Sequence, residues 1–122
     1  MSKTLVFVYG TLLAGEPNNF FLKGSTKLGE DSVTGFLMKD LGPFPACVPN
    51  DNENNTIVGE VWEVSDETFK HLDRLEGYPD FYDRVLVDTF AGKAWIYVNA
   101  GASSSPTIKS GDWKKYLIER DD

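Results

Sequence analysis

The sequence LVFVYGTL at residues 5–12 is the strongest indication of the fold. The first five of these residues are all apolar or aromatic, so both faces of an extended chain would be hydrophobic. Such a run is typical of a strand that is buried on both sides. Gly10 ends the run, and the glycine and proline residues that follow predict a loop over residues 10–19. We therefore expect a core strand whose end opens into a loop.

Four more strands are expected downstream, at residues 33–41, 56–64, 82–90 and 93–98. The last two are joined by a tight hairpin at Ala91 and Gly92. The prolines of residues 42–45 should prevent regular structure there, and the polar residues 50–55 should form an exposed hairpin tip. Many strands with few helices favour an α+β fold built around a curled sheet or small barrel.

One helix is expected between residues 65 and 77. Ser65 and Asp66 are both candidate N-caps, and Gly77 is suited to ending the helix. An apolar stripe at helical spacing is supplied by Phe69, Leu72 and Leu75. Two shorter helices are expected at residues 19–23 and 112–119.

Length and charge restrict the classes of partner. The 122 residues carry 12 Lys and Arg against 19 Asp and Glu, a formal net charge of −7, and we expect one domain over residues 1–122. An acidic surface repels phosphate backbones and anionic lipids, so neither nucleic acid nor a membrane is an expected partner. The single cysteine, Cys47, cannot form an intrachain disulfide, which suits a soluble cytoplasmic protein.

The loop after the first strand does not fit a nucleotide-binding motif. A phosphate loop needs Lys and then Ser or Thr after its second glycine, whereas Glu16 and Pro17 follow Gly15. The loop is either a plain turn or a turn whose backbone N–H groups converge on a small anion such as a carboxylate. No metal site is expected, because one histidine, His71, and one cysteine cannot assemble a zinc set.

The sequence LDRLEGYP at residues 72–79 carries the best candidate for acid–base chemistry. Asp73 and Glu76 are three residues apart and share a helix face, while Leu72 and Leu75 point to the core. Glu76 therefore lies beside the buried edge, at the C-terminal end of the helix. The helix dipole and partial desolvation both raise its pKa, which suits a general base near neutral pH. The alternative is that Glu76 merely solvates the helix end.

Seven short motifs follow one another along nearly the whole chain: VFVYGTL at 6–12, FPA at 44–46, GEVW at 59–62, LDRLEGYP at 72–79, FYDR at 81–84, AWIYV at 94–98 and GDW at 111–113. Each motif is weak alone, but YGTL after the first strand combined with LEGYP downstream is specific. On these motifs the chain resembles the γ-glutamylcyclotransferase-like (AIG2-like) family, and most closely its γ-glutamylamine cyclotransferase branch.

The resemblance implies a small mixed β-barrel with flanking short helices. It implies a reaction that releases an amine from a γ-glutamyl amide by intramolecular attack, forms 5-oxoproline and needs no metal or cofactor. Glu76 would be the general acid/base. The turn Tyr9, Gly10, Thr11 and Leu12 would hold the γ-glutamyl group through its backbone N–H groups.

The resemblance leaves several residue roles open. Tyr9, Tyr82 and Tyr97 are candidates for lining the cavity, with core packing as an equal alternative for each. Arg84 is expected to pair with a nearby acid rather than with substrate. Leu13 and Ala14 stand where many relatives carry a basic residue, so the leaving group recognised can differ.

Two other functions stay open. One is a non-catalytic small-molecule-binding or interaction domain on the same fold, since one fold hosts many functions. The other is a glutathione-acting relative, which the Thr-Leu form of the turn and the short chain disfavour.

Overall fold

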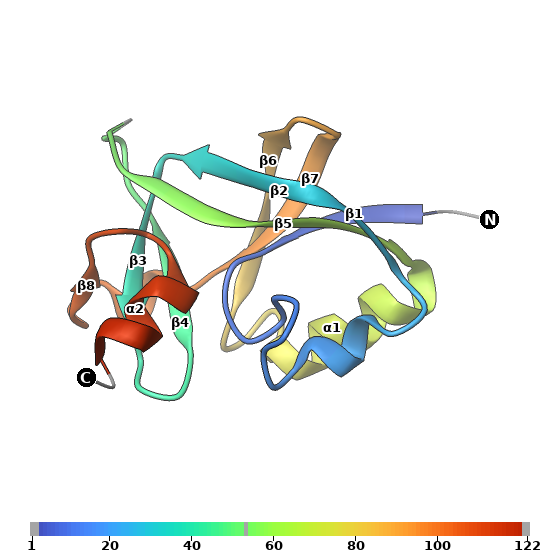
Figure 1. Cartoon of the computed structure of the whole chain (residues 1–122), viewed down its shortest axis with the longest axis horizontal. Coiled ribbons are helices and arrows are strands. Elements are labelled where there is room, and N and C mark those ends of the chain that lie inside the picture. Colours follow the sequence, from blue (N-terminus) through green and yellow to red (C-terminus); the bar gives the residue numbers. More distant parts are fainter. Residues whose placement is uncertain (1–2, 53, 121–122) are drawn as a thin grey trace.

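The computed structural model describes residues 3–52 and 54–120. Five strands form one sheet in the order β2, β5, β1, β7, β6, and three form a smaller sheet in the order β4, β3, β8 (Figure 1). The strands are β1 (Lys3–Val8), β2 (Thr26–Thr34), β3 (Phe36–Asp40), β4 (Pro45–Pro49), β5 (Thr56–Ser65), β6 (Asp83–Thr89), β7 (Gly92–Val98) and β8 (Thr107–Ile108). The helical elements are η1 (Asn19–Leu22), α1 (Asp66–Glu76), η2 (Ala100–Ala102) and α2 (Trp113–Arg120). The expected α+β fold with flanking short helices is confirmed.

The larger sheet is built around β1, which pairs antiparallel with β5 and parallel with β7. The last three residues of β1 are buried, as the apolar run predicts. The β6–β7 hairpin reaches back to β2, where the Phe90 N–H donates a hydrogen bond to Asp31 (2.9 Å). Within residues 3–52 and 54–120 no ladder joins β2 to β6, so the sheet curls without closing into the barrel that the resemblance implies.

The strand expected at residues 33–41 is divided between the two sheets. The break falls at Gly35, whose φ of 91° lies in the left-handed region and turns the chain from β2 into β3. β2 also begins earlier than expected, at Thr26. Most of its residues are exposed or half-exposed, because it is an edge strand, and it therefore lacks the apolar pattern of a core strand.

The prediction that prolines exclude regular structure near residue 45 is wrong. β4 begins at Pro45 and ends at Pro49, at the edge of the smaller sheet, where a missing backbone N–H is tolerated. β4 and β5 belong to different sheets, so residues 50–55 connect two sheets instead of forming a hairpin tip. Asp51 and Asn52 are exposed there, as expected, and residue 53 lies outside the described residues.

The helix α1 lies where the sequence predicts it, and Ser65, rather than Asp66, is its N-cap. The Ser65 hydroxyl accepts a hydrogen bond from the Thr68 N–H (3.1 Å), and Gly77 ends the helix with φ of 68°. Leu72 is fully buried and packs α1 against the larger sheet, beside η1 (Figure 1). This packing brings the last residue of α1, Glu76, to the end of β1.

The helix α2 closes the described chain against the smaller sheet and β5 (Figure 1). Gly111 precedes it, and a Cβ atom there would lie 1.9 Å from the Thr56 carbonyl oxygen, so only glycine fits this approach to β5. Trp113 is buried and joins α2 to the core. Among the described residues, no helix combines the length and apolar character needed to cross a membrane.

Candidate active site

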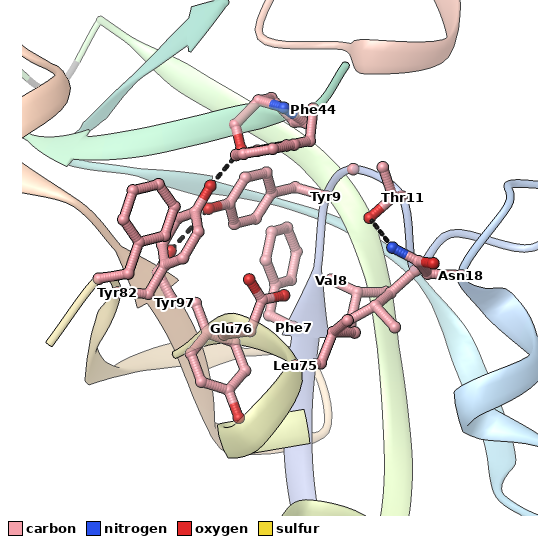
Figure 2. A pocket seen from close by; sticks show the side chains of 14 residues that line it. Phe7, Val8, Tyr9, Thr11, Asn18, Phe44, Leu75, Glu76, Tyr82 and Tyr97 are labelled. Carbon is pink, nitrogen blue, oxygen red and sulfur yellow. Dashed lines mark hydrogen bonds between the residues drawn. The ribbon is translucent and has the colours of Figure 1, made fainter. Parts of the chain in front are cut away.

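A cavity of about 190 Å³ opens where β1 ends, beside the last turn of α1 (Figure 2). It is lined by the end of β1 and its turn, by the loops before β4 and β6, and by β7. The lining residues are Phe7, Val8, Tyr9, Gly10, Thr11, Leu12, Asn18, Phe44, Pro45, Leu75, Glu76, Phe81, Tyr82 and Tyr97. Every site residue expected from the sequence therefore lies in this one cavity.

Glu76 points its carboxylate into the cavity from the end of α1 (Figure 2). Burial raises the pKa of this carboxyl from 4.5 to about 7. Desolvation, one of the two causes expected from the sequence, accounts for the shift. In the described part of the chain, no donor is hydrogen-bonded to the Glu76 carboxylate, which leaves both oxygens open to a ligand. A group with this pKa can take and return a proton near neutral pH.

The turn after β1 lines the same cavity with Gly10, Thr11 and Leu12. The Leu13 N–H closes the turn on the Gly10 carbonyl oxygen (3.1 Å). The N–H groups of Gly10, Thr11 and Leu12 make no hydrogen bond to any described residue. Unpaired N–H groups at a cavity wall are suited to binding an anionic or carbonyl oxygen.

Glycine is required at position 10 for a steric reason. A Cβ atom there would lie 2.6 Å from Cγ of Pro45, closer than two carbon atoms can approach. The missing side chain lets the turn after β1 approach the first residue of β4 at the cavity wall. Close packing against Pro45 of β4 thus explains the glycine of the YGTL motif.

Asn18 is a cavity residue that the sequence analysis missed. Its side-chain N–H donates to Oγ1 of Thr11 (3.0 Å), and its backbone N–H donates to the Thr11 carbonyl (2.8 Å) (Figure 2). The Thr11 hydroxyl therefore accepts from Asn18 and keeps its own proton available to a ligand. No local pattern marks Asn18, because its role depends on the loop folding back on the turn.

The three candidate tyrosines line the cavity, and their hydroxyl groups form hydrogen bonds with other parts of the protein. Tyr9 donates to the Tyr97 carbonyl (2.7 Å) and accepts from the Cys47 N–H (3.2 Å). Tyr82 donates to the Pro45 carbonyl (2.8 Å), and Tyr97 donates to Asp73 (2.8 Å). Burial raises the pKa of all three phenols above the ordinary value, so they stay protonated. Their rings shape the cavity, while their hydroxyl protons hold neighbouring segments in place.

Asp73 and Arg84 form a pair beside the site. Nε of Arg84 lies 3.0 Å from Oδ1 of Asp73, and the guanidinium stacks over Tyr78 (4.0 Å) and Trp95 (4.6 Å). Neither residue lines the cavity. The pair joins the last turns of α1 to β6 and fixes the position of Glu76 one helical turn further on.

The far side of the cavity is aromatic. Phe44 and Phe81 meet edge to face with ring centroids 6.2 Å apart, and Tyr82 lies against both. Phe81 is 52% exposed and stands at the rim. No Lys or Arg lines the cavity among the described residues. Neither Phe44 nor Phe81 is among the site residues expected from the sequence.

Among the described residues, no group of three or more His, Cys, Asp or Glu side chains is placed to hold a metal ion. His71 is exposed on α1, and Cys47 is buried in β4 as a small core residue.

Comparisons with known proteins show which family the chain belongs to. The family described as gamma-glutamyl cyclotransferase, AIG2-like, matches residues 6–115. The gamma-glutamylcyclotransferase family protein YtfP of Escherichia coli is 34% identical over 109 residues, covering 88% of this chain and 94% of YtfP. The gamma-L-glutamyl-butirosin B gamma-glutamyl cyclotransferase of Niallia circulans is 34% identical over 125 residues, covering 93% of this chain and 78% of that protein. A crystal structure of a Pyrococcus horikoshii protein superposes with a TM-score of 0.83 at 32% identity, covering 97% and 96% of the two chains.

Proposed function

Because the chain belongs to the gamma-glutamyl cyclotransferase, AIG2-like family, we propose that it releases an amine from a γ-glutamyl amide by cyclising the γ-glutamyl group to 5-oxoproline. One observation carries the proposal. The Glu76 carboxylate, with a pKa of about 7, shares a cavity with Gly10, Thr11 and Leu12, whose backbone N–H groups bind no other described residue. The proposed site therefore combines a proton acceptor with a binding place for an anion.

Glu76 moves one proton in each half of the proposed reaction. The ionised carboxylate takes a proton from the α-ammonium of the substrate, and the freed amine attacks the γ-carbonyl carbon. A carbon–nitrogen bond forms and closes the five-membered ring. Glu76 then returns this proton to the leaving nitrogen as the original amide bond breaks, and the ring nitrogen gives up its second proton to the released amine, which leaves as an ammonium. A pKa of about 7 suits both steps at neutral pH.

The turn positions the γ-glutamyl group. Its N–H groups bind the α-carboxylate, which places the α-amine near Glu76. Because the nucleophile and the carbonyl belong to one molecule, folding the substrate into a near-attack geometry supplies much of the rate enhancement. The rings of Tyr9, Tyr82 and Tyr97 limit the conformations that the bound substrate can adopt.

The aromatic side of the cavity receives the leaving amine. Phe44, Phe81 and Tyr82 offer apolar surface, and a carboxylate on the leaving group meets no cation among the described lining residues. This favours a γ-glutamyl amine over glutathione, whose leaving group is a dipeptide with a carboxylate. The name of the Niallia circulans relative, which acts on a γ-glutamyl derivative of butirosin B, supports release of an amine.

A substrate panel tests the proposal. Purified protein is incubated with γ-glutamyl-butylamide, γ-glutamyl-ε-lysine and glutathione, and 5-oxoproline is measured by chromatography. We expect more 5-oxoproline from γ-glutamyl-butylamide, whose leaving amine has no carboxylate, than from γ-glutamyl-ε-lysine or glutathione, whose leaving groups both carry one. Melting shifts with γ-glutamyl compounds but no 5-oxoproline from any of them would support a non-catalytic binding domain instead.

A matched pair of variants tests the role of Glu76. Glu76→Gln should lower kcat on the order of 10²-fold or more, because the amide cannot carry the proton. Glu67→Gln removes a carboxylate from the exposed first turn of the same helix and should keep wild-type activity. Equal activity of Glu76→Gln and the wild type would refute the assigned role.

A further inference from the structure

A second buried carboxylate, Glu60 in β5, takes no part in the proposed proton transfer. Its side chain is 5% exposed. Oε1 accepts hydrogen bonds from the backbone N–H of Ala14 (3.0 Å) and the indole N–H of Trp62 (3.1 Å), and Oε2 lies 3.5 Å from Nζ of Lys27. Burying a carboxylate is unfavourable unless donors compensate it. Three donors do so here, and one of them belongs to the loop that carries the turn.

Ala14 is held from both sides. Glu60 accepts from its N–H, and Lys114 of α2 donates to its carbonyl oxygen. Ala14 is two residues beyond Leu12, which contributes the last N–H of the turn. The peptide groups next to Ala14 cannot rotate without breaking one of these two hydrogen bonds. Glu60 thus ties the turn to the larger sheet, and Lys114 ties it to α2.

The opposite end of the loop is held by its own side chains. Asn18 binds Thr11, and the Asn19 side chain donates to the Leu12 carbonyl (2.8 Å). The turn between these anchors is free to present its N–H groups to the cavity. Glu60 itself does not line that cavity; it faces a separate hollow of about 310 Å³ behind the turn, together with Leu13 and Lys114.

We infer that Glu60 is a positioning residue of the candidate active site: with Lys114, it holds Ala14 so that the N–H groups of Gly10, Thr11 and Leu12 converge on one oxygen-bearing group. The inference rests on the proposed function for the identity of that group, the γ-glutamyl carboxylate. Loss of Glu60 weakens substrate binding and leaves the proton transfer of Glu76 intact.

Steady-state kinetics with γ-glutamyl-butylamide separate binding from chemistry. Glu60→Ala should raise KM on the order of 10-fold or more, as expected when charge-assisted or backbone hydrogen bonds to a carboxylate are misplaced. Its kcat should change much less, and its pH profile should keep the break set by Glu76. Glu30→Ala is the matched control, since Glu30 lies opposite Glu60 in the β2–β5 register and its side chain is exposed. An unchanged KM in folded Glu60→Ala overturns the inference.

Amide NMR tests the same inference without turnover. Glu60→Ala and Lys114→Ala should both shift the resonances of Gly10, Thr11 and Leu12 and accelerate their hydrogen exchange, while β6 stays unchanged. Changes confined to β5 and Trp62 would show a purely structural role and refute the inference. Lys114→Ala carries the test if Glu60→Ala does not fold. If no substrate yields 5-oxoproline while the turn amides respond, the proposed function fails and the positioning role stands.

Discussion

The end of α1 and the middle of β5 each place a glutamate in a largely buried environment, but with opposite surroundings. Glu76 faces a cavity, and among the described residues no donor reaches its carboxylate. Glu60 receives two N–H groups and the ammonium of Lys27. The first carboxyl has a pKa raised to about 7 by desolvation, whereas the second anchors a loop. Burial alone does not determine what a carboxylate does; the supply of donors does.

The same contrast separates a reactive group from a supporting one. A carboxyl without protein donors retains its capacity to bind a ligand and exchange a proton. A carboxyl whose oxygens accept hydrogen bonds from the protein holds the donating segments in fixed positions. The turn at Gly10–Leu12 lies between the two residues and depends on both in the proposed reaction.

Removing the anchored carboxylate should have the largest effect on stability. Glu60→Ala leaves the Ala14 and Trp62 N–H groups without their acceptor and Lys27 without its partner, which should cost about 3 to 4 kcal/mol of the free energy of unfolding. Urea denaturation measures this loss. Glu30→Ala, at an exposed position in the paired strand, should lie within about 0.5 kcal/mol of the wild type.

The pH dependence of activity should report the carboxyl in the cavity. Glu76 must be ionised to accept the first proton, so kcat/KM should fall about tenfold per pH unit below 7, or about 100-fold at pH 5. Rates of 5-oxoproline formation between pH 5 and 8 measure this. Glu60→Ala should leave the break where it is. A break that moves in this variant would mean that the two carboxylates are not independent.

Stability should respond to pH through Glu76 in the sense opposite to a salt-bridged acid. Its pKa is about 7 in the folded protein against 4.5 ordinarily, so the folded state holds more protons between these values. The free energy of unfolding therefore falls as pH rises from 4.5 to 7. Glu76→Gln, a neutral substitute, should be more stable than the wild type by about 2 to 3 kcal/mol at pH 8 and nearly equal at pH 4.5. Denaturation at both pH values checks the sign, and a less stable variant at pH 8 would contradict it.

A change in the turn should imitate the loss of its anchor while leaving both carboxylates in place. In Gly10→Ala, the new Cβ would lie 2.6 Å from Cγ of Pro45, so the turn must shift. We expect KM for γ-glutamyl-butylamide to rise about tenfold, because roughly one hydrogen bond to the substrate is lost. Adding Pro45→Ala should relieve the clash and recover part of the loss. If KM does not recover in the double variant, the clash with Pro45 is not the cause of the defect.

Local sequence predicted the elements whose signals are themselves local. The candidate caps Ser65 and Asp66, the apolar stripe and Gly77 are all local signals, and α1 lies between them as expected. β2 was missed because it is a mostly exposed edge strand, recognisable only by its pairing with β5. β4 was missed because prolines argue against a strand until its place at the edge of a sheet is known.

The site divides in the same way. Glu76 and the turn were predicted because they lie in compact motifs, whereas Asn18, Phe44 and Phe81 reach the cavity through loops without a local signature. The tyrosines were left between lining and packing. They do both, and this depends on hydroxyl partners that are distant in the sequence. The acceptor for Tyr9, for example, lies 88 residues away in the chain.

The sequence by itself determined the order of the elements around the site: a core strand ending in a glycine turn and a capped helix ending in Glu76. These features depend on backbone propensities, capping and side-chain periodicity, which act over a few residues. Only the tertiary structure decided that no donor among the described residues reaches Glu76, and that Glu60 has two N–H donors and the Lys27 ammonium beside it. It also decided that the turn shares a cavity with Glu76 and is held at Ala14 by Glu60. Desolvation and hydrogen-bond supply come from segments remote in the sequence, so they exist only once the chain has folded.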